Sequence, residues 1–130
     1  MKTVILFAFL LLSQTAFAQY NLPVTFDDTE VTYTVTDFGG NASEIVTDPT
    51  NAENTVVKTV KTATAELWAG TTIGEAASFL DPLPFSPSFA TMTVRVWSPD
   101  AGIPVRLKVE TFGDPTRSVE TEAVTTVAGE

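Results

Sequence analysis

The sequence predicts an all-β protein folded as an antiparallel β-sandwich. Threonine and valine, whose branched Cβ atoms favour extended backbone, recur throughout the chain. Apolar and polar residues alternate with a period of two in residues 31–35, 92–96 and 105–110. Clusters of Gly, Pro, Asp and Asn separate such runs, and short strands at this spacing are typical of sandwiches.

Eight strands are expected. They cover residues 22–27, 31–36, 43–47, 55–61, 65–70, 91–97, 104–111 and 118–126. Turn residues fall at 37–41, 48–51, 98–102 and 113–115. A single helical turn is expected near residues 73–79, and the proline-rich residues 80–89 are expected to cross between the two sheets.

The first eighteen residues predict a secretory signal peptide. Lys2 supplies the positive start, residues 4–12 are apolar, and Ala16-Phe17-Ala18 forms an A-x-A cleavage site. The apolar run is far shorter than the roughly 20 residues that span a bilayer, and no later stretch is apolar enough to stop transfer. We therefore expect a secreted protein without membrane insertion, whose residues 19–130 form one sandwich module.

The amino-acid composition excludes several classes of function. The chain has a net charge of −9, and removal of Lys2 with the signal peptide makes it one unit more negative. Such a surface repels the phosphates of nucleic acids. Cysteine and histidine are both absent, which excludes disulfides, thiol catalysis, the Ser-His-Asp triad and histidine-bound metals. Catalysis would depend on carboxylates, and their arrangement along the chain does not predict an enzyme.

Two segments carry a family resemblance. Residues 66–72 (ELWAGTT) and 95–110 (RVWSPDAGIPVRLKVE) resemble secreted bacterial jelly-roll modules, the β-sandwich carbohydrate-binding modules attached to polysaccharide-degrading glycoside hydrolases. Residues 22–28 (LPVTFDD) are similar to the first strand of that family. The resemblance implies a jelly-roll fold, related to galactose-binding domains, and a polysaccharide or oligosaccharide ligand.

The chain departs from this family after residues 129–130. Such modules continue into a Trp-containing strand and close with a strand that bears Asp-Asp. The resemblance therefore implies a module truncated at its C-terminus, without its last strands, and a covalently linked downstream domain.

The candidate carbohydrate-binding residues are two tryptophans and their polar neighbours. A sugar ring packs its C–H face on an indole, while its hydroxyls hydrogen-bond to charged side chains. Strand alternation places Trp68 on the same face as Glu66, and Trp97 on the same face as Arg95. The candidates are Glu66, Trp68, Arg95, Trp97 and Arg106. The alternative is that both tryptophans fill the core.

Asp27 and Asp28 are the candidate metal ligands. With Glu30 they form the densest carboxylate cluster, and carboxylate oxygens are the ligands that Ca²⁺ prefers. A structural calcium would help to hold a domain that has no disulfides, and related jelly rolls often bind one near the first strand. The alternative is a solvated turn.

Three functions compete. The first is a non-catalytic carbohydrate-binding module, and the second is a structural or adhesive sandwich at the cell surface without a small ligand. The third is a fragment of a glycoside hydrolase whose catalytic domain lies beyond residue 130. Exposed aromatic side chains on one sheet face favour the first function, and buried tryptophans favour the second.

The signal peptide gives the first testable prediction. Because Ala16-Phe17-Ala18 matches the preference of signal peptidase for small residues, cleavage should follow Ala18. N-terminal sequencing of the exported protein should begin at Gln19. Recovery of exported protein that still begins with Met1 would contradict the prediction.

Overall fold

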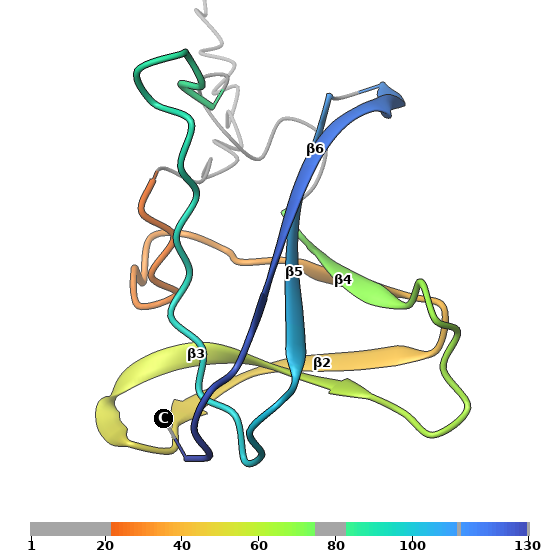
Figure 1. Cartoon of the computed structure of the whole chain (residues 1–130). Helices are drawn as coiled ribbons and strands as arrows, with labels where there is room; N and C mark the ends of the chain where they lie inside the picture. Colours follow the sequence, from red (N-terminus) through yellow and green to blue (C-terminus); the bar gives the residue numbers. More distant parts are fainter. Residues whose placement is uncertain (1–21, 75–82, 112, 130) are drawn as a thin grey trace, which may run out of the picture. The chain divides into compact units, whose positions relative to one another are not determined.

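The computed structural model describes residues 22–74, 83–111 and 113–129. In these ranges the chain is all β, without a helix, and every strand pair is antiparallel, so the predicted fold class is confirmed at that level. The chain divides into two compact units, one that ends at Ile73 and one that begins at Gly74. Figure 1 gives the strand labels used below.

Some sequence predictions fall outside the described ranges. They include the signal peptide of residues 1–18, residues 75–79 of the expected helical turn and residues 80–82 of the expected crossover loop. No helix long and apolar enough to cross a bilayer occurs in the part of the chain that is described. The prediction that residues 19–130 form one sandwich stays a prediction.

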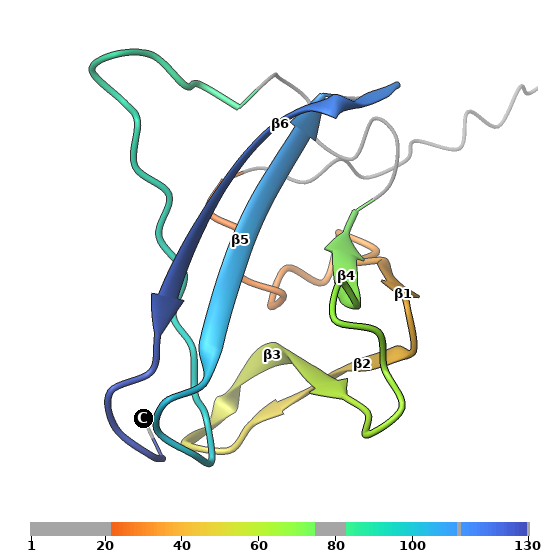
Figure 2. The ribbon, with the colours of Figure 1, turned by 45° about the vertical axis from the view of Figure 1, so that its right-hand side comes forward.

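The first unit contains two antiparallel pairs. Strand β1 (Val35–Phe38) pairs with β4 (Gly70–Ile73), and β2 (Asn41–Asp48) pairs with β3 (Asn51–Lys61). Figure 2 shows the β2–β3 hairpin and the shorter β1–β4 pair. The strands expected at residues 43–47 and 55–61 are confirmed and longer than expected, and the turn expected between them connects β2 to β3.

Two strands expected in the first unit do not form, and a third is much shorter than expected. Residues 22–27 form no strand, because Phe26 has a φ of 63°, in the left-handed region that extended chains avoid. The strand expected at residues 31–36 begins only at Val35, because its partner β4 is four residues long. Residues 65–69 form turns instead of a strand, as described below.

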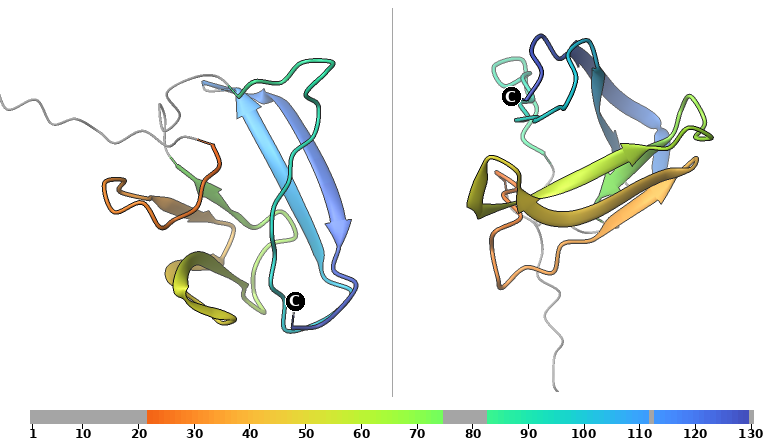
Figure 3. Two further views of the ribbon diagram at one scale, coloured as in Figure 1. Left: turned by 90° about the vertical axis from the view of Figure 1, so that its left-hand side faces the viewer. Right: turned by 90° about the horizontal axis from the view of Figure 1, so that it is seen from below.

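The second unit is built around one long hairpin. Strand β5 (Pro104–Thr111) matches the expected strand at 104–111, and β6 (Asp114–Val124) begins earlier than the expected 118–126. Figure 3 shows the hairpin from two further directions. Residues 91–97, expected to be a strand, join no β-ladder in the described chain. An alternating sequence becomes a strand only when another strand is available to pair with it.

The described residues do not enclose a hydrophobic core. None of their large side chains is fully buried, and Leu67 and Phe89 are 96% and 70% exposed. Hydrophobic burial therefore contributes less to the structure of each unit than it does in a closed sandwich. Backbone ladders and polar side-chain contacts contribute correspondingly more to the structure of each unit.

One cluster of polar side chains links all four strands of the first unit. The Asn41 Nδ2 atom donates to the hydroxyls of Thr59 and Thr71, both at 2.6 Å. Asp37 accepts from the Thr71 hydroxyl and the Ser43 backbone N–H, both at 2.7 Å. The Thr71 hydroxyl, and then the Ser43 and Asn41 donors, lower the pKa of the Asp37 carboxyl. We call these five residues the polar junction.

Asp48 fixes the turn between β2 and β3. Its Oδ1 atom accepts from the backbone N–H and the hydroxyl of Thr50, and its Oδ2 atom accepts from Asn54 Nδ2, each at 2.7 Å. These donors, led by the Thr50 backbone N–H, lower the Asp48 pKa to about 2. Aspartate at this position is typical of a turn that a side-chain acceptor stabilises.

The lowered Asp48 pKa predicts an acid-sensitive hairpin. A carboxyl with a depressed folded-state pKa adds stability above its unfolded value of 3.8, and that stability is lost as the pH falls toward about 2. The protection factors of the β2–β3 amides, which compare each exchange rate with the intrinsic rate at the same pH, should therefore fall as the pH is lowered between these two values. In Asp48→Asn this pH-dependent fall in protection should shrink.

Thr50→Val is the matched control for this prediction. It keeps the backbone N–H donor to Asp48 and removes only the hydroxyl donor, so its acid response should lie between the parent and Asp48→Asn. An unchanged acid response in Asp48→Asn would show that another group controls the hairpin.

Candidate functional site

The five candidate carbohydrate-binding residues are divided between the two units. Glu66 and Trp68 lie in the first unit, while Arg95, Trp97 and Arg106 lie in the second. Each group is therefore described separately. Both tryptophans are substantially exposed, Trp68 at 66% and Trp97 at 43%, so neither fills a core in the described structure.

Trp68 is exposed because it occupies the centre of a tight turn. The Ala69 backbone N–H donates to the Glu66 carbonyl at 3.0 Å, which closes a turn with Leu67 and Trp68 at its two central positions. The expectation that Glu66 and Trp68 share a strand face is wrong, because this segment is a turn in which Glu66 is the first residue and Trp68 the third.

The Trp68 ring is held against a second aromatic ring. It stacks parallel to Phe38 of β1, with 6.2 Å between ring centroids and 6° between ring planes. Two glycines make room for the pair. A Cβ atom at Gly70 would lie 2.8 Å from Phe38 Cζ, and one at Gly39 would lie 2.9 Å from Trp68 Cζ3. We call Phe38 and Trp68, with these glycines, the aromatic platform.

Backbone and lysine contacts fasten the turn to the rest of the unit. The Glu66 backbone N–H donates to the Gly39 carbonyl, and Lys61 Nζ donates to the Leu67 carbonyl, both at 2.8 Å. The Lys61 ammonium therefore lies at the Trp68 turn, of which Glu66 is the first residue. Lys61 comes from the end of β3, so three strands and a turn contribute to this region.

Sequence reasoning missed three parts of the platform. Phe38 and Gly39 appeared only as members of a turn, and Gly70 only as the end of an expected strand. The aromatic-Gly-Gly run at residues 38–40 and the Trp-Ala-Gly run at residues 68–70 were the available signals. Their connection depends on the pairing of Phe38 with Gly70 across β1 and β4, which the sequence alone does not reveal.

The candidates of the second unit do not form a comparable platform. Trp97 and Arg95 are exposed in a segment outside any β-ladder, which removes the strand that was to place them on one face. Arg106 lies on β5, where its guanidinium contacts Glu122 at 2.9 Å and Glu120 at 3.6 Å. The hydrogen bonds that Arg106 donates to Glu122, with the charges of both glutamates, raise the Arg106 pKa.

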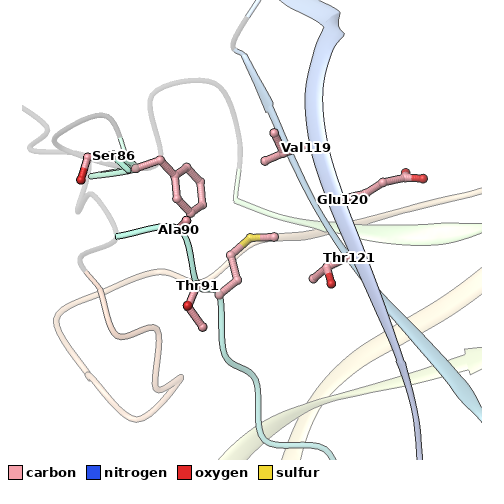
Figure 4. Close-up of a pocket in the computed structure, with 8 residues that line it drawn as sticks. Ser86, Ala90, Thr91, Val119, Glu120 and Thr121 are labelled. Atoms are coloured by element: carbon pink, nitrogen blue, oxygen red, sulfur yellow. The ribbon is translucent and has the colours of Figure 1, made fainter. Parts of the chain in front are cut away.

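A hollow of about 510 Å³ lies within the second unit. Its walls are the segment from Phe85 to Met92 and the β6 residues Val119 to Thr121. Figure 4 shows Val119 and Thr121 directed toward this segment and Glu120 directed away from it. A ligand site normally combines an apolar wall with convergent polar groups, so this hollow favours apolar packing over specific recognition.

Asp27 and Asp28 each accept a hydrogen bond from a backbone N–H. Asp27 Oδ1 accepts from the Thr55 backbone N–H at 2.7 Å, and Asp28 Oδ1 accepts from the Glu30 backbone N–H at 2.9 Å. Within the described ranges, no three Asp or Glu side chains are grouped so that they could hold a metal ion. The structural calcium therefore stays a prediction that the described geometry does not support.

Comparison of the chain with protein-family models, with curated proteins and with solved structures finds no match. The functional case accordingly depends on the geometry of the aromatic platform and on the sequence.

The packing of Phe38 over Gly70 gives a prediction about the platform. In Gly70→Ala the added Cβ would lie 2.8 Å from Phe38 Cζ, so the ring must move. We expect a loss of about 1–3 kcal/mol in the free energy of unfolding, as for other overpacked sites. Urea unfolding measures the loss, and near-ultraviolet circular dichroism reports the disturbed stacking.

A double-mutant cycle separates this clash from a general effect of alanine in a strand. Phe38→Leu shortens the side chain above Gly70, so Gly70→Ala should cost less in that background than in the parent. Equal costs in both backgrounds would contradict the proposed packing.

Proposed function

We propose that this chain is an exported, non-catalytic carbohydrate-binding module of the jelly-roll type that acts within a longer polysaccharide-degrading or glycan-binding protein. The observation that supports this most is the aromatic platform of the first unit. Trp68 is 66% exposed, and its ring stacks against Phe38. A large exposed aromatic ring supported by a second ring is typical of a binding surface.

The chemistry of the platform suits a sugar ring. Pyranose rings have an apolar C–H face that packs on an indole, and a rim of hydroxyls that need donors and acceptors. Lys61 is a donor and Glu66 an acceptor in the region of the Trp68 turn. The proposed site therefore keeps Trp68 and Glu66 from the sequence-based prediction. Lys61 takes the place of Arg106 as its cationic side chain.

A binding role also agrees with the composition. Without histidine or cysteine the chain lacks the usual general base and thiol nucleophile. Arg106, Glu120 and Glu122 are committed to ion pairs on one exposed hairpin face. These features favour recognition over catalysis for this chain.

A structural or adhesive role is the second candidate. It is favoured by exposed large apolar side chains outside the platform, such as Phe89 at 70% and Val119 at 55%. Surfaces of this kind pack against other proteins more readily than against glycans. The two candidates differ in whether removal of the Trp68 ring changes binding to a polysaccharide.

Affinity electrophoresis tests the carbohydrate proposal. The exported chain should be retarded in gels that contain one of several polysaccharides, for which β-glucan, agar, xylan and mannan are suitable first choices. Trp68→Ala should weaken this retardation, with a dissociation constant raised by about tenfold or more, because both apolar burial and stacking are lost. Trp68→Phe should retain part of the affinity.

Leu67→Ala is the matched control, because Leu67 shares the turn and is 96% exposed. It should bind as the parent does. Trp97→Ala shows whether the second unit contributes independently. Retention of full affinity by a folded Trp68→Ala variant would contradict the platform, and a parent that binds none of the glycans would favour the structural or adhesive role.

A further inference from the structure

Residues 41–43 (Asn-Ala-Ser) match the acceptor sequence for N-glycosylation, which the proposed function does not use. In N-glycosylation, an oligosaccharyltransferase moves an oligosaccharide from a polyprenyl diphosphate to an asparagine side chain. The bond from sugar C1 to the diphosphate oxygen breaks and a bond from C1 to Nδ2 forms. The polyprenyl diphosphate leaves, and one amide proton is taken up by solvent. An acceptor asparagine normally lies in a surface loop, where its Nδ2 atom is accessible.

Asn41 lies in a strand instead of a loop. It is the first residue of β2, half-buried, and it pairs with Lys61 of β3. Its Nδ2 atom donates to the hydroxyls of Thr59 on β3 and Thr71 on β4, both at 2.6 Å. A side-chain amide has two N–H donors, so these two bonds use both of them. Replacement of either proton by a sugar therefore removes a contact to one of these strands.

The space around this nitrogen is also occupied. The Asp37 carboxylate and the Ser43 hydroxyl each lie 3.4 Å from Nδ2, so oxygens from all four strands of the unit surround it. A C–N single bond is about 1.45 Å long, so C1 of a sugar would lie well within the 2.6 Å that separates Nδ2 from either threonine hydroxyl. A glycan at Asn41 must therefore displace at least one strand from the polar junction.

The serine of the acceptor sequence is engaged in the same place. The Ser43 hydroxyl, which the acceptor sequence requires, bonds to the Thr71 hydroxyl at 2.6 Å. The Ser43 backbone N–H donates to Asp37 at 2.7 Å. Asn41 and Ser43 share one face of β2 because alternate residues of a strand do so. The transferase would have to separate both residues from their partners before it could act.

We propose that Asn41 is a shielded N-glycosylation acceptor, which is modified only while the first unit is unfolded and whose modification prevents the polar junction from forming. Every residue that shields Asn41 belongs to the first unit, so the argument does not involve the second unit. The proposal rests on export of the chain, but not on carbohydrate binding. An export pathway that contains the transferase should therefore give two products, a folded chain without a glycan and a glycosylated chain without the junction.

Post-translational glycosylation of the purified chain tests the shielding. Parent and variants are incubated with purified oligosaccharyltransferase and a polyprenyl-diphosphate-linked oligosaccharide, and mass spectrometry locates the modified asparagine. Thr71→Val removes a hydroxyl that bonds to both acceptor residues and to Asp37, and leaves the acceptor sequence intact. Its modification at Asn41 should exceed that of the parent by about tenfold or more, because the lost hydrogen bonds raise the population in which the junction is open.

Three controls accompany this experiment. Thr72→Val changes the next residue of β4, which is exposed, and should behave as the parent does. Glu53→Thr creates a second acceptor sequence at Asn51, which is exposed at the start of β3, so the folded variant should be modified at Asn51 and not at Asn41. A synthetic peptide of residues 37–47, which cannot form the junction, should be modified at Asn41.

Translation of the whole chain in the presence of microsomes tests whether the glycan and the junction exclude each other. Some molecules should be glycosylated before the first unit folds. These molecules should be digested by a low concentration of protease about tenfold faster than the unglycosylated molecules of the same reaction, because they lack the junction. Glycosylated Glu53→Thr molecules that carry the glycan only at Asn51 should be digested as slowly as unglycosylated ones.

Several outcomes would overturn the proposal. A folded parent that is modified at Asn41 as fully as Thr71→Val would show that the junction does not shield the acceptor. Equal protease resistance with and without a glycan at Asn41 would show that the two are compatible. An unmodified peptide, or microsomes that yield no glycosylated chain, would show that Asn41 is not an acceptor. If Thr71→Val does not fold, the comparison of Asn41 with Asn51 in Glu53→Thr still decides the question.

Discussion

The polar junction is the contact on which the first unit depends most. Its five side chains connect β1, β2, β3 and β4 in a region where no large described side chain is fully buried. Each such hydrogen bond contributes about 0.5–1.5 kcal/mol net, and bonds to a charged group contribute more. Because Asp37 and Asn41 flank the Gly39-Gly40 turn, the junction also fixes where β1 ends. The position of Phe38, and hence of the aromatic platform, follows from it.

Exposed apolar groups are organised differently in the two units. In the first unit an exposed indole stacks on Phe38, and glycines leave space for both rings. In the second unit the apolar side chains of β5 on one hairpin face are half-buried, and Val119 of β6 beside them is exposed. The exposed apolar groups of the two units therefore have different surroundings.

Local sequence patterns predicted the hairpins well. The strands that were predicted wrongly depend on pairing between distant parts of the chain. Strand β5 matches its prediction because alternation and a flanking turn are both encoded within a few residues. Residues 91–97 alternate equally well but join no ladder, since pairing requires a partner far along the chain. Trp68 was expected on a strand, either exposed or in the core, and it is exposed at a turn centre instead. Phe38 and Gly70 escaped notice because only the β1–β4 register brings them together.

The placement of Trp68 at a turn centre has a consequence for how such a surface evolves. Turn-centre residues belong to no ladder, so their replacement leaves the strand hydrogen bonds in place. The ring can therefore be exchanged, enlarged or given polar neighbours while the scaffold below keeps its geometry. On the proposed function, a ring that already packs on Phe38 would lose less conformational entropy on binding a ligand than a free indole would. Residues at the turn centre would then contact the ligand, while the ladders below them hold the strands together.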